Sequence, residues 1–272
     1  MNHKKSTQIT LLLTLAVLVA GGAMLLYALA MPDSSLMRWL NDGVDKAIAQ
    51  AKQLAQAASD RVALQWCQFQ ENQLVKAEIQ DTIKQKNNFL ILHLSCLNTL
   101  PREIGQLTQL KNLSIEGYSL LVLPSEIGQL TQLKNLYIER SQLTILPSEI
   151  GQLTQLKQLI VDNNRLTMLP PEIGQLTELE CLNVSNNQLT VLPSEIGQLT
   201  HLKALIVRNN NLIVLPPEIG QLTHVNLLDV SRNQLTTLPP EIKALPYLII
   251  VGFPKTTPIS FPNITPTTGH GR

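Results

Sequence analysis

The stretch "LPSEIGQLTQLKNLYIERSQLTILP" at residues 123–147 decides the fold, because the chain repeats it almost word for word on both sides. The phrase begins 23 residues earlier as "LPREIGQLTQLKNLSIEGYSLLVLP" and 23 residues later as "LPSEIGQLTQLKQLIVDNNRLTMLP". Leu-Pro keeps this spacing along the sequence, at Pro101, Pro124, Pro147, Pro170, Pro193, Pro216 and Pro239. A fixed period of this length indicates a stack of similar units, each packing on its neighbours.

Within each unit, the apolar residues predict one short strand and one short helical turn. Leu136 and Ile138 alternate with residues of other kinds, which is the period of a strand with one buried face. Such strands stack as parallel neighbours about 4.8 Å apart. The Pro-Ser-Glu-Ile opening places Pro and a carboxylate at a helix start, where both are favourable. The apolar residues that follow it are expected to point inward at helical spacing: Ile127, Leu130 and Leu133.

One asparagine per unit falls at the same place in four successive units, at Asn164, Asn187, Asn210 and Asn233. A side-chain amide at that place can satisfy backbone groups inside a buried bend. The two preceding units carry Tyr118 and Ser141 instead. We therefore expect an asparagine ladder that is incomplete towards the N-terminus.

The form LxxLxLxxNxL, with the wording "LPxEIGxLxxLKxLxL", resembles leucine-rich repeat proteins over residues 87–255. It is most similar to the 23-residue class of Ras-suppressor-like, Scribble-like and plant intracellular Ras-group repeats, here in a membrane-anchored bacterial form. The resemblance implies an α/β solenoid, a horseshoe with a parallel concave sheet and short convex helical turns. Degenerate units flank the regular ones, with their apolar positions at Leu90, Leu92, Leu97 and Leu100 on one side and Leu248, Val251 and Phe253 on the other.

The N-terminal region predicts a membrane anchor. Lys4 and Lys5 precede residues 9–31, which carry no charge and would span about 34 Å as a helix, enough for a bilayer core of about 30 Å. The lysines place residues 1–8 in the cytoplasm and the repeats on the far side, periplasmic or extracellular. Cleavage after Ala30 is the alternative, because Ala-Leu-Ala has the form of a signal-peptide site.

Residues 32–86 predict a helical stalk and N-terminal cap. Candidate helix caps are Asp33, Ser34 and Ser35. The small apolar residues of 44–62 follow a heptad spacing, which fits either weak self-association or packing of one amphipathic helix on its neighbour. A second stripe of Val75, Ile79 and Ile83 is expected to cover the end of the stack. Residues 256–272 are rich in Pro and Thr and predict a flexible tail.

Composition excludes several classes of function. The net charge of +1 and an aromatic content of 4% argue against a nucleic-acid partner. The sequence holds no nucleotide-binding, nucleophile-elbow or zinc-protease motif, so we predict no enzyme, no cofactor and no catalytic or metal-ligating residue. His201 and His224 stack one unit apart, within about 5 Å, but lack a third ligand. Three cysteines without CxxC spacing are interpreted as free or buried thiols: Cys67, Cys96 and Cys181.

Residues that carry function are expected where the repeated sequence varies from unit to unit, at the outward positions of the strands. These form three columns on the concave face. The first holds Asn112, Asn135, Gln158, Cys181, Ala204 and Leu227, the second Ser114, Tyr137, Ile160, Asn183, Ile206 and Asp229, and the third Glu116, Glu139, Asp162, Ser185, Arg208 and Ser231. An apolar strip with charged borders is typical of a protein-binding surface, and similar leucine-rich proteins usually bind partners there.

We therefore predict that a protein or peptide binds to twelve of these residues: Asn135, Tyr137, Glu139, Gln158, Ile160, Asp162, Asn183, Ser185, Ile206, Arg208, Leu227 and Asp229. Tyr137, Ile160, Ile206 and Leu227 are expected to expose apolar area. The alternative is a structural or adhesive protein of the cell envelope that has no specific catalytic or signalling partner.

Overall fold

The computed structural model describes residues 44–245 and 247–253, with side chains described from Leu64 onwards except for Trp66. Among these residues, no helix combines the length and apolar character needed to cross a bilayer. The predicted anchor at 9–31, the candidate caps at 33–35 and the predicted tail at 256–272 lie outside the described residues. The heptad stripe at 44–62 falls on described backbone whose side chains are not described.

One long helix, α4 (Val44–Gln85), precedes eight strands that alternate with seven short 3-10 helices. The strands are β1 (Phe89–Leu94), β2 (Asn112–Gly117), β3 (Asn135–Glu139), β4 (Gln158–Ile160), β5 (Cys181–Asn183), β6 (Ala204–Ile206), β7 (Leu227–Asp229) and β8 (Ile249–Val251). The 3-10 helices are η1 (Arg102–Gln106), η2 (Ser125–Gln129), η3 (Ser148–Gln152), η4 (Pro171–Gln175), η5 (Ser194–Gln198), η6 (Pro217–Gln221) and η7 (Pro240–Ala244).

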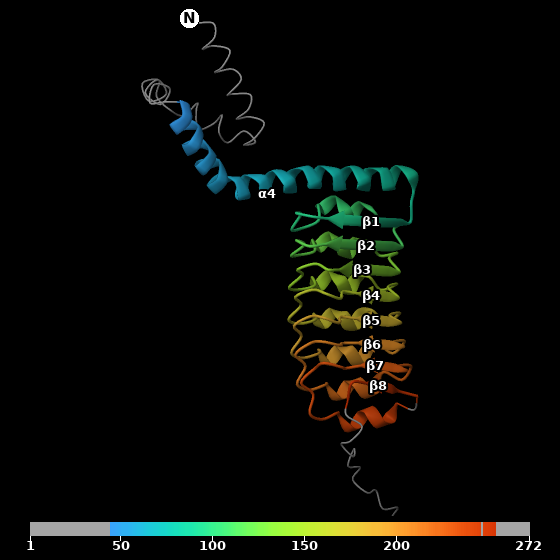
Figure 1. Cartoon of the computed structure of the whole chain (residues 1–272). Coiled ribbons are helices and arrows are strands. Elements are labelled where there is room, and N and C mark those ends of the chain that lie inside the picture. Colours follow the sequence, from blue (N-terminus) through green and yellow to red (C-terminus); the bar gives the residue numbers. More distant parts are fainter. Residues whose placement is uncertain (1–43, 246, 254–272) are drawn as a thin grey trace, which may run out of the picture.

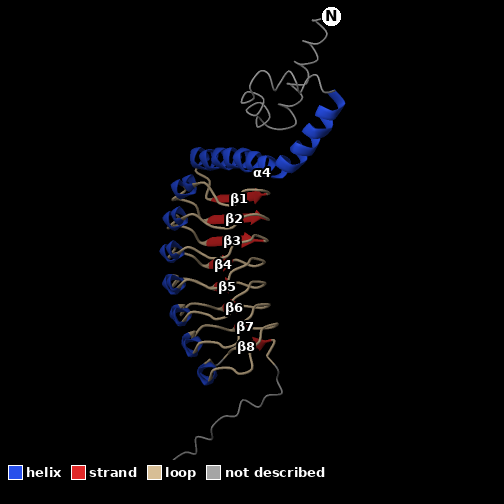
Figure 2. Cartoon of the chain, turned by 90° about the vertical axis from the view of Figure 1, so that its left-hand side faces the viewer, coloured by secondary structure: helices blue, strands red, loops and turns tan. Residues whose placement is uncertain are grey.

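The strands form a single parallel sheet in sequence order, from β1 to β8. Neighbouring strands pair residues one repeat apart, as Leu136 pairs with Leu159. The sheet lines one side of the stack and the 3-10 helices line the other, while α4 lies across the end next to β1 (Figures 1 and 2). The predicted solenoid of parallel strands and short helical turns is confirmed.

The core lies between the sheet and the 3-10 helices. Leu136 and Ile138 on β3 are fully buried, as are Ile127, Leu130 and Leu133 around η2. Backbone hydrogen bonds join Leu130 N to Ile127 O and Leu133 N to Leu130 O. This spacing of three residues is the period of a 3-10 helix, so every apolar side chain returns to the same inward face.

The glycine of the "EIGQ" phrase allows successive 3-10 helices to lie close together. A Cβ atom at Gly151 would lie 2.5 Å from Gln175 Oε1 and 2.8 Å from the backbone oxygen of Glu172, both in the next turn. Real Cβ atoms do not approach so closely, so a larger residue would push the two turns apart. Glycine is needed here for its small size.

The asparagine ladder is confirmed. Asn187 accepts a hydrogen bond from Leu166 N at 2.9 Å and donates to Val161 O at 2.8 Å, so its amide joins two successive bends. Equivalent bonds are made by Asn164, Asn210 and Asn233. These amides satisfy backbone groups that would otherwise be buried without a partner.

Helix α4 covers the N-terminal end of the core, but not with the residues expected. Val75 and Ile79 are buried as predicted, whereas Ile83 is 38% exposed. Thr82 is buried in its place. At 100° per residue, position 82 returns to the face shared by 75 and 79, and position 83 turns away from it.

Hydrogen bonds, an ion pair and a disulfide fasten α4 to the first unit. The Glu71 carboxylate accepts the backbone N–H groups of Ser95, Cys96 and Leu97. Lys76 pairs with Glu103 at 2.8 Å, and this hydrogen bond lowers the pKa of the Glu103 carboxyl. Cys67 and Cys96 form a disulfide, with their Cα atoms 6.1 Å apart.

The prediction that Cys67 and Cys96 are thiols is therefore wrong, because α4 folds back along β1 and brings the two residues together. Cys181, by contrast, is a free thiol. Its partial burial raises the pKa of that thiol.

Candidate protein-binding face

The structure brings the predicted outward residues together on the sheet face. Residue pairing along the sheet places Tyr137 between Ser114 and Ile160, which confirms the geometry of the second column. On each regular strand, the side chains between these outward positions are fully or almost fully buried in the core. The three columns therefore form the surface that the sheet presents to solvent.

The apolar part of this face is distributed differently from the prediction. Tyr137, Ile160, Ile206 and Leu227 are only partly exposed. The larger apolar exposures lie at the two ends of the sheet. Phe89 and Ile91 on β1 are 55% and 54% exposed, and Ile249 and Val251 on β8 are 64% and 41% exposed.

These end residues were missed because the flanking units are degenerate. Phe89 and Ile91 continue the first and second columns, since they pair with Asn112 and Ser114. Val251 was counted among the apolar positions of the C-terminal flanking unit, but on β8 it faces outward. Leu227 pairs with Ile249, a spacing of 22 residues, so the register moves by one position. Ile250 consequently packs against the core and Val251 faces outward.

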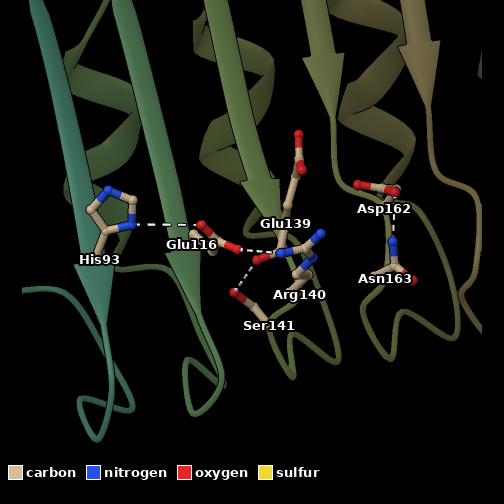
Figure 3. A network of polar contacts seen from close by, with 7 residues as sticks. All are labelled: His93, Glu116, Glu139, Arg140, Ser141, Asp162 and Asn163. Atoms are coloured by element: carbon tan, nitrogen blue, oxygen red, sulfur yellow. Dashed lines mark hydrogen bonds and ion pairs between the residues drawn. The ribbon is translucent and has the colours of Figure 1, made fainter.

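A charged network occupies the N-terminal half of the third column (Figure 3). Arg140 Nη1 lies 2.8 Å from Glu116 Oε1, and His93 Nδ1 lies 3.6 Å from Glu116 Oε2. The hydrogen bond that Arg140 donates to Glu116 raises the pKa of the Arg140 guanidinium. Arg140 has a positive φ of 51°, which turns the chain at the end of β3. Glu116 is thus largely neutralised by its own chain.

Two neighbouring carboxylates of the same column are left without a cation among the described residues. Glu139 points away from the Glu116–Arg140 pair (Figure 3). One Asp162 oxygen accepts a hydrogen bond from Asn163, and its Oδ1 atom is buried with no partner. The acidic strip predicted at Glu116, Glu139 and Asp162 therefore offers negative charge mainly through the last two residues.

Several residues of the outward columns form hydrogen bonds with residues close to them in the sequence. Ser185 is 6% exposed, and both its N–H and its hydroxyl donate to Asn183 Oδ1. Ser231 donates to Asp229 in the same way. Ser185 is consequently too buried to serve as a contact, which corrects its place in the predicted set. In the short bends after β5 and β7, the side chains of Asn183 and Asp229 thus accept hydrogen bonds from the serine two residues later.

Tyr137 is held in place by its own neighbours. Its hydroxyl donates to Gln158 Oε1. Burial, reinforced by Cys181 and Glu139, raises the pKa of this phenol. Tyr137 thus stays uncharged and presents a fixed ring to the solvent side of the sheet.

The histidine pair lies outside the strands, since His201 precedes β6 and His224 precedes β7. The rings of His201 and His224 are stacked with centroids 5.9 Å apart, slightly farther than expected. Each Nδ1 contacts a backbone carbonyl, that of Thr177 at 2.9 Å and that of Thr200 at 2.7 Å. A carbonyl can only accept, so each Nδ1 carries a proton. Among the described residues, no group of three potential ligands surrounds a common point.

A second exposed apolar set was not predicted. Its members lie two residues before each repeated proline, on the side of the stack that follows the asparagine bend. They are between 43% and 53% exposed: Val122, Ile145, Met168, Val191 and Val214. The signal was visible in the sequence, because this position is always apolar in the regular units between Thr99 and Thr237. We call this set the lateral stripe.

Comparison with known proteins agrees with the fold. The family described as "Leucine-rich repeat region" matches residues 62–163 and 148–214, which together cover more than half of the chain. A leucine-rich repeat protein of Leptospira interrogans is similar in structure, with a TM-score of 0.56 and 42% identity over 58% of this chain. No curated protein sequence matches the chain.

A second similar structure is the ectodomain of the plant membrane receptor kinase GASSHO1/SCHENGEN3 from Arabidopsis thaliana, solved in complex with CASPARIAN STRIP INTEGRITY FACTOR 2. It has a TM-score of 0.52 and 29% identity over 58% of this chain. The chain spans only 40% of the Leptospira structure and 20% of the plant structure.

Proposed function

Because the chain belongs to the leucine-rich repeat family, we propose that it is a membrane-anchored member of the 23-residue class that binds a protein or peptide through its concave face. Proteins of this family are generally binding modules without catalytic activity, and the role proposed here needs no catalysis.

One observation carries the proposal: inward positions are uniform and outward positions are not. Leu113, Leu136, Leu159, Leu182, Leu205 and Leu228 repeat the same residue at the centre of six strands. The residue that follows each of them faces outward and changes at every unit, as in Ser114, Tyr137 and Ile160. Folding requires the inward leucines, whereas it does not require particular outward residues. Binding of a partner therefore explains outward side chains such as Tyr137 better than folding does.

The chemistry of the face favours a partner with apolar side chains and positive charge. Partly exposed Tyr137 and Ile160 lie beside Glu139 and Asp162, whose carboxylates have no cation among the described residues. Phe89 and Ile91 extend the apolar area to the first strand. The plant ectodomain solved with CASPARIAN STRIP INTEGRITY FACTOR 2 supports a comparable binding role for this chain.

The membrane-anchored location rests on the sequence and is supported by the disulfide. Residues 9–31 have the length and apolar character of a signal anchor. A disulfide such as Cys67–Cys96 persists mainly in oxidising compartments. Both features fit repeats that lie on the periplasmic or extracellular side. A reporter active only outside the cytoplasm, fused after Arg272, is expected to work. Activity of a cytoplasm-only reporter instead would overturn this orientation.

The partner is tested with the full-length chain as bait in detergent extracts of the membranes of its source. A triple variant with Tyr137→Ala, Ile160→Asp and Ile206→Asp is compared with the wild type and with a His201→Gln/His224→Gln control. We expect a protein that the wild type and the control capture and the triple variant loses. Equal capture by all three would show that the concave face is not the binding surface.

A further inference from the structure

The lateral stripe lies on one flank of the stack, between the sheet and the 3-10 helices. In each regular unit, the chain leaves the asparagine bend beside the sheet and crosses to the 3-10 helix on the opposite side (Figure 2). The stripe residue lies on this crossing and faces solvent, as Ile145 and Met168 do with exposures of 46% and 53%. Ile213, next to Val214, adds a further side chain that is 59% exposed. Folding gives no reason for apolar side chains on this flank.

Backbone hydrogen bonds hold the crossing segments in register. Arg165 N donates to Leu143 O at 2.9 Å, and Gln188 N donates to Leu166 O at 2.8 Å, so each segment is fixed to the one before it. With units about 4.8 Å apart, the stripe from Val122 to Val214 extends over about 19 Å. A fixed apolar strip of this kind, bordered by charge, is typical of an interaction surface.

Carboxylates border the stripe on the side of the 3-10 helices. One glutamate lies in the first turn of each of these helices, and Glu126 lines the same cleft as Val122 of the stripe. Glu126 is paired with Arg102. In the next three units the glutamates are partly exposed and form no ion pair with a described cation: Glu149, Glu172 and Glu195.

Arginines border the stripe on the side of the sheet. Arg165 directly follows Asn164 of the asparagine ladder, at the start of the crossing to Met168. Arg208 and Arg232 lie in the bends after β6 and β7. All three are exposed, and none forms an ion pair with a carboxylate of the described residues. The stripe therefore separates a cationic border from an acidic one.

We propose that two copies of this chain pair through the lateral stripe, with a two-fold axis parallel to the stack. Rotation about this axis lays each stripe residue against the same residue of the second copy. It also lays the cationic border of one copy over the acidic border of the other, with Arg165 facing Glu172 of the second copy. A two-fold interface requires such a self-complementary surface.

The charges select this orientation over the opposed one. With the axis perpendicular to the stack, the two copies would point in opposite directions, and each border would meet the border of the same sign. Like charges facing each other across an interface oppose association. In the parallel arrangement, the helices α4 of both copies lie at the same end of the dimer. The concave faces stay free, so the pairing does not rest on the function proposed above.

Cysteine cross-linking of the full-length chain in the membranes of expressing cells tests the pairing. A Cys181→Ser background is used, because Cys67 and Cys96 are bridged and the introduced cysteine is then the free one. Under mild oxidation, we expect a covalent dimer from each of three single variants, since each position meets itself across the axis: Ile145→Cys, Met168→Cys and Val214→Cys. Gln155→Cys, exposed in the segment between η3 and β4, is the control and should stay monomeric.

Charge reversal tests the second element of the proposal. Arg165→Glu and Glu172→Arg should each weaken dimer formation at least about tenfold in sedimentation of the full-length chain in detergent, because a like-charge contact replaces an attractive one. The double variant restores opposite charges in both pairs and should recover dimer formation. The unfolding midpoint confirms that each variant is folded.

Three results would overturn the proposal. The first is a wild type that stays monomeric in sedimentation and stripe variants that give no cross-link. The second is a cross-link at only one stripe position, because in the opposed orientation only the position on the axis meets itself. The third is a double charge variant that associates no better than the single ones. If the chain stayed monomeric and Met168→Asp removed a captured protein, the stripe would belong to a different partner.

Discussion

Glu71 and Leu97 are joined by a hydrogen bond of 2.6 Å, in which the backbone nitrogen of Leu97 donates to the carboxylate of the helix residue. Two units further on, the equivalent nitrogen of Leu143 donates to Asn164 of the asparagine ladder. The ladder position next to Leu97 is held by Tyr118, which has no amide. A side chain of α4 therefore does in the first bend what an asparagine does in the regular ones, and α4 is an integral part of the repeat domain.

Glu71→Ala should lower the free energy of unfolding by about 1–3 kcal/mol, because three backbone donors lose their acceptor. Urea unfolding followed by circular dichroism measures this change. Glu78→Ala is the control, since Glu78 lies exposed on the same helix and should change stability by less than about 0.5 kcal/mol. Equal effects of the two variants would show that the Glu71 contacts do not stabilise the cap.

The disulfide gives a second prediction. Removing it with Cys67→Ser should lower the free energy of unfolding by about 2–4 kcal/mol, because the bridge closes a loop between residues 29 positions apart. The Cys181→Ser control should have a smaller effect.

Alkylation without reduction, followed by mass spectrometry, checks the bridge directly. One thiol per chain should react, and slowly at neutral pH, because burial raises the pKa of Cys181 and keeps it protonated. Three reactive thiols in the native protein would contradict the bridge.

The repeat made most of the fold predictable, whereas the features that depart from the repeat were not predictable. Strand positions, inward faces and the asparagine ladder follow from periodicity, since one unit determines its neighbours. The Cys67–Cys96 bridge depends on how α4 packs against β1, and sequence spacing carries no signal for that. The same holds for Glu71, an acidic residue on a helix that looks like any solvated charge.

The candidate face was predictable in position but less so in exposure. The register of the regular units placed Tyr137 and Ile160 correctly, because the side-chain period of a strand is fixed. How much of each ring or methyl group stays exposed depends on the residues in the adjacent strands. Ser185 shows most clearly that exposure was not predictable, since it donates a hydrogen bond to Asn183 and is buried. The one-residue change of spacing before β8 likewise turns Val251 outward, although it was counted among the repeated apolar positions.

Leu182 provides a test of the core. It is fully buried at the centre of β5, and Leu182→Ala should cost about 2–5 kcal/mol by leaving a cavity between two units. Thr190→Ala, at an exposed position of the same unit, should cost less than about 0.5 kcal/mol. Thermal and urea unfolding would measure both. A similar cost for the two variants would mean that the inward face is misassigned.

Gly174 tests the close contact between successive 3-10 helices. A Cβ atom there would lie 2.7 Å from the backbone oxygen of Glu195. Gly174→Ala should therefore destabilise the protein by about 1–3 kcal/mol, although alanine is ordinarily the better helix former. Ser194→Ala, at the exposed start of the next turn, is the control. An unchanged or raised unfolding midpoint for Gly174→Ala would show that the turns can separate without cost.

The last prediction concerns the concave face and follows from the position of Tyr137 and Ile160 side by side on β3 and β4. Apolar anchors near the middle of an interface usually dominate affinity. Tyr137→Ala or Ile160→Asp should therefore weaken partner binding at least about tenfold, or roughly 1.4 kcal/mol. Surface plasmon resonance with the captured partner measures this, and the unfolding midpoint confirms that each variant folds.

Charge on the same face should act differently from the apolar anchors. Glu139 points away from the Glu116–Arg140 pair (Figure 3) and has no cation among the described residues. Glu139→Lys should therefore mainly slow association with a positively charged partner, and less so at high salt. The His201→Gln/His224→Gln variant, on the other side of the stack, should bind like the wild type. If the histidine variant lost binding while Tyr137→Ala and Ile160→Asp kept it, the partner would bind outside the concave face.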